Sequence, residues 1–310
     1  MPLLKKVRVL AAKIEVTSGT AIALAAADAT YNCYDIEIQP NITVAQREGQ
    51  GSFGKLPAVH EGLVGTISFK TDMVGDGAAG TPAWATTMLP ACGFTVSVGT
   101  FTPKSEPPGT NVKTLTMAVY ENGLKKQLRG ASGTFKILME TGKPVMIEFT
   151  FTGIWTAPTD VAILAPTYVT QKPLRFANST LLIKESWSPC VQSVEIDAGN
   201  VVVARECQSA SDGSGYINAI ITDRQPVGKF NPESELVAGQ DTHGDWIAHA
   251  ENSLSISLTD GTDVVTISAP KIQYTNIQEG DRNGIQIDAI DFQCNKDTAD
   301  GDDEIEIDFS

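Results

Sequence analysis

The sequence predicts a mainly β protein made of two similar antiparallel domains in tandem, and three observations lead to this fold class. Many segments alternate between apolar and polar residues, helical patterns are few, and one stretch of the chain occurs twice. Ile36–Glu48 (IEIQPNITVAQRE) aligns without a gap with Val194–Glu206 (VEIDAGNVVVARE), and both end in Arg-Glu. With 310 residues, of which 42% are hydrophobic and 19% charged, the chain is long enough to bury two cores.

Further features follow each copy of this stretch in the same order. They are a Gly-led strand (Gly65, Gly228), a Trp-bearing helix (Trp84, Trp246) and a hairpin turn (Asn122-Gly123, Asp260-Gly261). The first copy has an additional Pro/Gly/Thr-rich stretch around 101–109. We therefore expect an N-terminal arm at residues 1–30, a first domain at 31–165 and a second domain at 166–310, with a Pro-containing linker between them.

Strands are predicted by period-two alternation. Val145–Thr152 places apolar residues on one face only, as a half-buried antiparallel strand does. Leu254–Ile267 indicates a hairpin, because its central Asp-Gly dipeptide accepts the positive φ angles of a tight turn. The alternation changes phase between Ile285 and Phe292, which predicts a bulge near Ala289. The acidic C-terminus, 304–309, also alternates and predicts a last strand rather than a disordered tail.

Helices are expected at few places. Thr81 is a suitable N-cap, Pro82 suits the first helical position, and the helix should end before Pro90 and Gly93. Its counterpart in the second copy is 244–251. A third helical pattern covers 4–13 and precedes an Ala/Thr/Gly stretch with little periodicity.

Acidic residues are concentrated in the second half. The chain has a net charge of −14, and residues 156–310 hold 25 Asp/Glu against 9 Lys/Arg. A field of this sign repels phosphate and excludes a protein that grips nucleic acid by counterion release, although it would help DNA to slide past. The alternative is that the acidity only maintains solubility. Since there is no apolar run of membrane-spanning length and no signal sequence, we expect a mature cytoplasmic product.

The motifs that often carry chemistry do not form a convincing site. Of the Gly-rich segments 49–54 and 75–80, only the second is expected between a strand and a helix, and it lacks a following acidic residue for a ribose and a following parallel strand, so it is read as a loop. The three histidines have the wrong spacing for one metal, and the aspartates of 297–303 do not match an EF-hand loop. Five scattered cysteines indicate reduced thiols. We expect no catalytic residue, no cofactor, no metal site and no enzymatic activity.

Longer phrases of the sequence resemble the tail tube (major tail) proteins of long-tailed, siphovirus-type bacteriophages. They include GDGAAGTPAWATTMLPACGF and LRGASGTFKILMETGKPVMIEFTFTGIWTAPTD in the first half and PCVQSVEIDAGNVVVARE in the second half. The similarity covers nearly the whole chain. It implies a β-sandwich or half-barrel domain with one short flanking helix, here in duplicated form, and a structural virion protein whose stacked rings form the conduit for DNA ejection.

The resemblance also implies partners. They are other copies of the chain and the tail terminator, tape measure and distal tail proteins, in a virion tail assembled in the host cytoplasm without a membrane. DNA would pass through the lumen without specific binding. Because one chain carries two copies of the unit, we expect a trimeric pseudo-sixfold ring, with a hexamer as the alternative. A β-sandwich carbohydrate-binding or adhesin protein is the alternative function.

Two sets of residues are candidates for these roles. Lumen-facing candidates are acidic residues expected on the non-core face of long strands: Glu140, Glu148, Asp288 and Asp291. Ring-stacking candidates lie in the loop of residues 71–81 and in the additional stretch of the first half: Asp72, Gly75, Asp76, Gly77 and Lys104. Unpaired sheet edges in such a domain are expected to be closed by neighbouring subunits.

Overall fold

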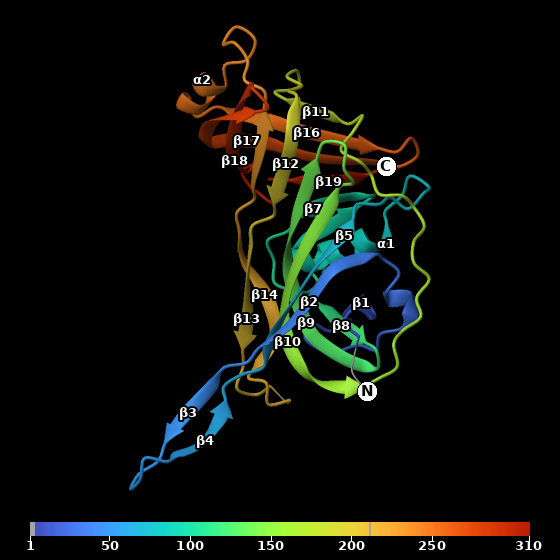
Figure 1. Ribbon diagram of the computed structural model, residues 1–310, viewed down its shortest axis with the longest axis vertical. Helices are drawn as coiled ribbons and strands as arrows, with labels where there is room; N and C mark the ends of the chain where they lie inside the picture. Colours follow the sequence, from blue (N-terminus) through green and yellow to red (C-terminus); the bar gives the residue numbers. More distant parts are fainter. Residues whose placement is uncertain (1–3, 211) are drawn as a thin grey trace.

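A computed structural model describes residues 4–210 and 212–310 (Figure 1). This part of the chain is mainly antiparallel β structure with two short α-helices, α1 (Ala83–Met88) and α2 (Thr242–Ile247). Fifteen strands belong to one connected sheet, and two hairpins stand apart from it. The fold class predicted from alternation is therefore confirmed at the level of a mainly β, antiparallel protein.

In the first half, six strands pair in the order β2-β5-β10-β9-β8-β1, each antiparallel to its neighbours. Their bounds are β1 Arg8–Ile14, β2 Cys33–Asn41, β5 Val64–Asp72, β8 Leu115–Glu121, β9 Leu124–Glu140 and β10 Met146–Asp160. β9 is long enough to have two neighbours on one side, with β8 along its first part and β12 along its last part.

The second half pairs its strands in a matching order, β12-β15-β18-β17-β16-β11. The bounds are β11 Thr180–Ile183, β12 Val191–Asp197, β15 Val227–Pro232, β16 Glu251–Thr259, β17 Val264–Arg282 and β18 Ile285–Cys294. Features that match in the sequence fall on matching elements, because Asn122-Gly123 joins β8 to β9 and Asp260-Gly261 joins β16 to β17.

Each half also carries a hairpin that extends its first two paired strands. We call these the β3–β4 arm, β3 (Val44–Glu48) with β4 (Lys55–His60), and the β13–β14 arm, β13 (Asn200–Glu206) with β14 (Tyr216–Arg224). The smaller elements are η1 Ala26–Asp28, η2 Leu89–Cys92, β6 Phe94–Ser97, β7 Thr100–Pro103 and β19 Glu306–Phe309. β6 and β7 form a hairpin at the start of the additional stretch of the first half.

The two halves are joined by strand pairing at two places. β12 pairs with β9, and the C-terminal strand β19 pairs with both β17 and β7. The hydrophobic core runs through both halves, from the stacked rings of Phe69 and Phe149 (centroids 5.5 Å apart) to the tilted pair of Phe230 and Phe292 (5.8 Å). The connection after β10, residues 161–174, runs in extended form along the first half (Figure 1).

The expected helix at 4–13 is wrong, because residues 8–14 form β1. Leu10 and Ala12 pack into the main core, while Val9 and Ala11 pack into a second cluster with Ala118 on the opposite face of the sheet. A strand covered on both faces reads as a continuous apolar run and loses the alternation that identifies a strand. Within the expected arm at 1–30, residues 8–14 thus belong to the sheet, and residues 1–3 lie outside the described part.

Other boundaries differ in detail. α1 has Pro82 rather than Thr81 at its N-cap, and α2 ends at Ile247 because β16 begins four residues later. The bulge predicted near Ala289 is wrong, because β18 pairs with β17 in unbroken register from Ile285 to Asp291, and the irregularity lies on β17 between Tyr274 and Asn276.

Candidate functional site: the polar sheet face and its open edges

One face of the joined sheet packs on the core and the other carries charged side chains in cross-strand register. Lys70 of β5 pairs with Glu148 of β10, which pairs with Lys136 of β9, and Lys136 in turn pairs with Asp197 of β12. The series continues from Glu195 of β12 through Lys229 of β15 to Asp291 of β18. We call this surface, with Glu140 at the end of β9, the polar face.

Ion pairs neutralise lysines of the polar face, one of them across the junction of the halves and one within the second half. Lys136 Nζ lies 2.9 Å from Asp197 Oδ2, and Lys229 Nζ lies 2.8 Å from Glu195 Oε2. The hydrogen bond to Asp197 raises the pKa of Lys136, so this side chain stays protonated. The eight residues of the polar face comprise five carboxylates and three ammonium groups, and the carboxylate of Glu140 is also paired with Lys143 Nζ at 2.7 Å.

The lumen-facing candidates divide between the two faces of the sheet. Glu140, Glu148 and Asp291 lie on the polar face. Asp288 does not, since it shares its side of β18 with the core residues Ile290 and Phe292 and is only 5% exposed. Its carboxylate accepts hydrogen bonds from Ser234 Oγ (2.7 Å) and, at 3.4 Å, from Thr242 Oγ1. As a solvent-facing candidate Asp288 was wrong, because period two assigns position 288 to the core side.

The ring-stacking candidates in the loop of residues 71–81 are held by contacts within the chain. Asp72 is buried and accepts a hydrogen bond from the hydroxyl of Tyr34, and Gly75 is buried as well. The backbone N–H groups of Gly77 and Ala79 donate to the carboxylate of Asp263, which lies just before β17. Asp76 is exposed and accepts from the N–H groups of residues 78 and 80, which lowers its pKa. The loop therefore packs against the second half, with Asp76 and Gly77 at the surface.

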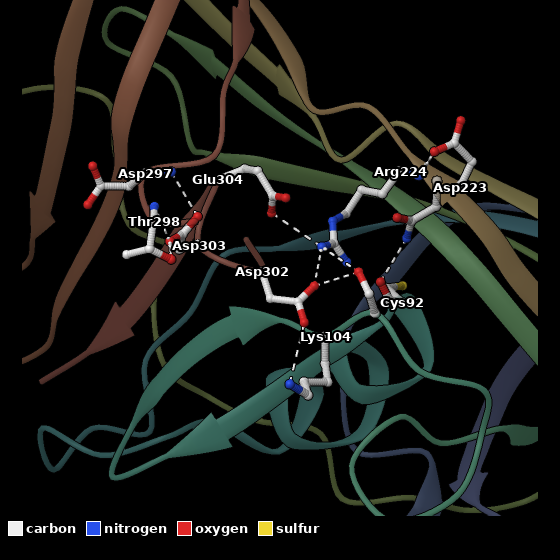
Figure 2. Close-up of polar contacts among 11 residues, drawn as sticks. Cys92, Lys104, Asp223, Arg224, Asp297, Thr298, Asp302, Asp303 and Glu304 are labelled. Atoms are coloured by element: carbon white, nitrogen blue, oxygen red, sulfur yellow. Dashed lines mark hydrogen bonds and ion pairs between the residues drawn. The ribbon is translucent and has the colours of Figure 1, made fainter. Parts of the chain in front are cut away.

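Lys104, the remaining candidate, belongs to a cluster that ties the C-terminal segment to both halves (Figure 2). Its Nζ lies 3.4 Å from Asp302, whose carboxylate also accepts from Ser105 Oγ and, at 3.0 Å, from Arg224. Arg224 reaches Glu304 at 3.2 Å, and its side chain is 7% exposed. Although burial acts against ionisation, the hydrogen bonds from Ser105 and Arg224 hold the pKa of Asp302 below its ordinary value.

Among the described residues, several strands of the joined sheet lack a partner on one side, including β1, β6 and β11. Two further open edges, one in each half, correspond to the strands that meet where β12 pairs with β9. β2 pairs with β5 on one side only, whereas its counterpart β12 lies between β15 and β9. On β17, the side that pairs with β16 ends at Gln273, and residues 274–282 continue beyond it without a neighbour on that side. The corresponding part of β9 is the segment that pairs with β12.

Matching residues of β12 and β2 differ in burial because only β12 has a neighbour on both sides. Val194 and Ile196 of β12 are each 1% exposed, because β9 covers the strand on its second side. Their counterparts in β2, Ile36 and Ile38, remain half-exposed. At the open edge of β2, apolar side chains are therefore partly in water, whereas the matching side chains of β12 are buried.

Sequence reasoning found three acidic residues of the polar face, Glu140, Glu148 and Asp291. It missed the other two, Glu195 and Asp197, and their lysine partners. Lys136 and Lys229 were signalled only by their places in alternating strands, and Asp263 by its place beside a turn dipeptide. Which strand lies next to β9 is a non-local property, so the ion pairs across the junction had no local signal.

The cysteines and the acidic C-terminal loop carry further side chains of the types that serve as sites of chemistry. All five cysteines are free, and burial raises the pKa of the Cys92 thiol. Asp303 accepts hydrogen bonds from the backbone of residues 297 and 298, so it is engaged by protein donors. No group of three or more His, Cys, Asp or Glu in this part of the chain is placed to hold a metal ion. No helix within it has the length and apolar character needed to cross a bilayer.

Comparisons with known proteins leave the family open. A scan against models of protein families finds no match to the chain, and a search of curated proteins finds no match either.

Proposed function

We propose that this chain is the ring-forming structural subunit of a tube, of the duplicated tail tube type found in long-tailed bacteriophages. In this proposal each half is one tail-tube-like β-sandwich or half-barrel domain, and three chains close a pseudo-sixfold ring. Rings stack into the conduit for DNA, and terminator, tape measure and distal tail proteins complete the tail. The sequence resemblance motivates the proposal, and the seam between β9 and β12 carries it.

The seam supplies a template for contacts between chains. Five residue pairs, from Ser193↔Glu140 to Asp197↔Lys136, join β12 to β9 in antiparallel register. β2 is the counterpart of β12, and β17 is the counterpart of β9. These two strands lie at the ends of the run from β2 to β17, and neither has the neighbour that its counterpart has at the seam. Pairing β2 of one chain with 276–282 of the next repeats the seam, uses different surfaces on the two chains, and closes into a ring when the rotation allows it.

The polar face supports a lumen for DNA. It extends across the seam and carries the carboxylates of Glu140, Glu148 and Asp291, of which Glu140 is paired with Lys143. Carboxylates on a bore repel phosphate, which keeps DNA from adhering during exit. The paired lysines moderate this charge, since Lys136 and Lys229 are engaged by Asp197 and Glu195.

Negative-stain microscopy and mass measurement of the concentrated, purified chain test the proposal. We expect annuli or tubes whose rings contain three chains and show six similar lobes. Rings of six chains would support the hexameric alternative. Persistent monomers at high concentration would refute the tube proposal, and affinity for glycans in that case would favour the adhesin.

A further inference from the structure

The two arms occupy matching places in the two halves, and their first strands, β3 and β13, belong to the sequence repeat, yet only one arm is packed. The β13–β14 arm lies along β9 and β10 of the first half, whereas the β3–β4 arm projects from the molecule (Figure 1). Ala219 of the packed arm is fully buried and Asn218 is 4% exposed. All six residues of β4 are exposed.

Hydrogen bonds hold the packed arm against residues 129–133, in the middle of β9. Arg129 Nη1 donates to the carbonyl of Ile217 at 2.8 Å, and Ser132 Oγ donates to the carbonyl of Ala219 at 3.0 Å. At the base of the arm, Asn200 Nδ2 donates to the carbonyl of Gly133 at 2.9 Å. The arm therefore contacts the part of β9 that adjoins the segment paired with β12, and it continues the contact between the two halves.

The unpacked β3–β4 arm exposes several apolar side chains to solvent. Val44 and Val59 are each 51% exposed, Leu56 is 44% exposed, and Phe53 at the tip is fully exposed. An isolated two-stranded hairpin is marginally stable in water, and exposed apolar side chains gathered on one element mark an interaction surface. The arm also carries Arg47 and Lys55 against one carboxylate, whereas the second half has the acidic excess.

From these observations we propose that the β3–β4 arm lies across β17 and β18 of the second half of a neighbouring copy, as the β13–β14 arm lies across β9 and β10. The occupant of that surface is a second copy of this chain, because the chain already holds one such pair of elements in contact. Ile247 of α2 offers an apolar side chain near β17 that is 77% exposed. This inference rests on the proposed ring and adds to it a contact that holds adjacent chains together, between the β3–β4 arm of one chain and β17 and β18 of the next.

The test uses the full chain in two experiments. The first is the double variant Leu56→Asp with Val59→Asp, compared with Val98→Asp, which changes a fully exposed valine in the β6–β7 turn. Because the arm residues are exposed in the single chain, we expect unchanged monomer unfolding but ring assembly that requires about tenfold more protein or fails, since two apolar side chains no longer become buried. Val98→Asp should close rings at the wild-type concentration.

The second experiment places a photo-crosslinking amino acid at position 56 of assembled rings and maps the products by mass spectrometry. Crosslinks to β17, β18 or α2 of another chain are expected. Crosslinks to the first half or to a different ring, or normal ring closure by the double variant, would overturn the arm inference while wild-type rings still uphold the tube proposal. If the wild-type chain forms no rings, the tube proposal fails first, and the arm inference fails with it.

Discussion

Ile196 and Ile38 occupy the same position in the two copies of the repeat and differ in whether a neighbouring strand covers them. Ile196 of β12 is 1% exposed and lies opposite Ile137 of β9, whereas Ile38 of β2 is half-exposed at an open edge. We predict that Ile196→Ala lowers the free energy of unfolding of the single chain by about 2–5 kcal/mol, the usual cost of truncating a fully buried isoleucine. Ile38→Ala should cost about 1 kcal/mol or less, because part of its side chain is already in water.

The order of the two effects should reverse in assembly. If β2 joins β17 of another chain, Ile38 becomes buried there, and truncating it removes stabilisation from each contact between chains. A loss of about 2 kcal/mol per contact weakens association roughly 30-fold. Urea unfolding of dilute chains gives the first quantity, and sedimentation over a concentration series gives the second. Equal unfolding losses in the two variants, or wild-type assembly by Ile38→Ala, would refute the reasoning.

Three further predictions concern the other contacts. Asp302→Asn should destabilise the chain by about 1–3 kcal/mol at neutral pH, since it leaves the buried guanidinium of Arg224 with one charged partner fewer. Because the pKa of Asp302 is lowered in the folded state, the difference in unfolding free energy between wild type and variant should vanish as pH falls through that pKa, which unfolding titrations measure. Asp263→Ala should release the loop 75–80, seen as faster amide exchange there, with unchanged exchange counting against the anchor. Glu148→Lys with Asp291→Lys should leave rings intact and slow genome ejection from reconstituted particles, whereas normal ejection would contradict an acidic bore.

Local patterns in the sequence predicted much of the secondary structure. Asp260-Gly261 and the alternation around it gave the β16–β17 hairpin, because both turn and strand are encoded within a few residues. The repeat at 36–48 and 194–206 fell on matching strands for the same reason. Where both faces of a strand are covered, as in β1, the local pattern failed, because the alternation disappears.

The candidate surface was harder to predict, since it depends on which strands become neighbours. Glu148 was found from its place on the polar side of β10, but Lys136 acquires its role only when β12 comes to lie beside it. Asp288 was misplaced because the phase of β18 was read from its first isoleucines, Ile285 and Ile287, rather than from Ile290. The asymmetry of the two arms was not predicted, because the repeat that identified them covers β3 and β13 but not β4 and β14, whose sequences differ.

The β9·β12 seam and the β7·β19 pairing have a consequence for how quickly rings could form. A covalently tethered half meets its partner at an effective concentration in the millimolar range, far above that of separate molecules. Half of the joints in a ring would then already exist when each chain finishes folding. Closure would need half as many encounters between diffusing subunits, and fewer incomplete arcs would accumulate along the way.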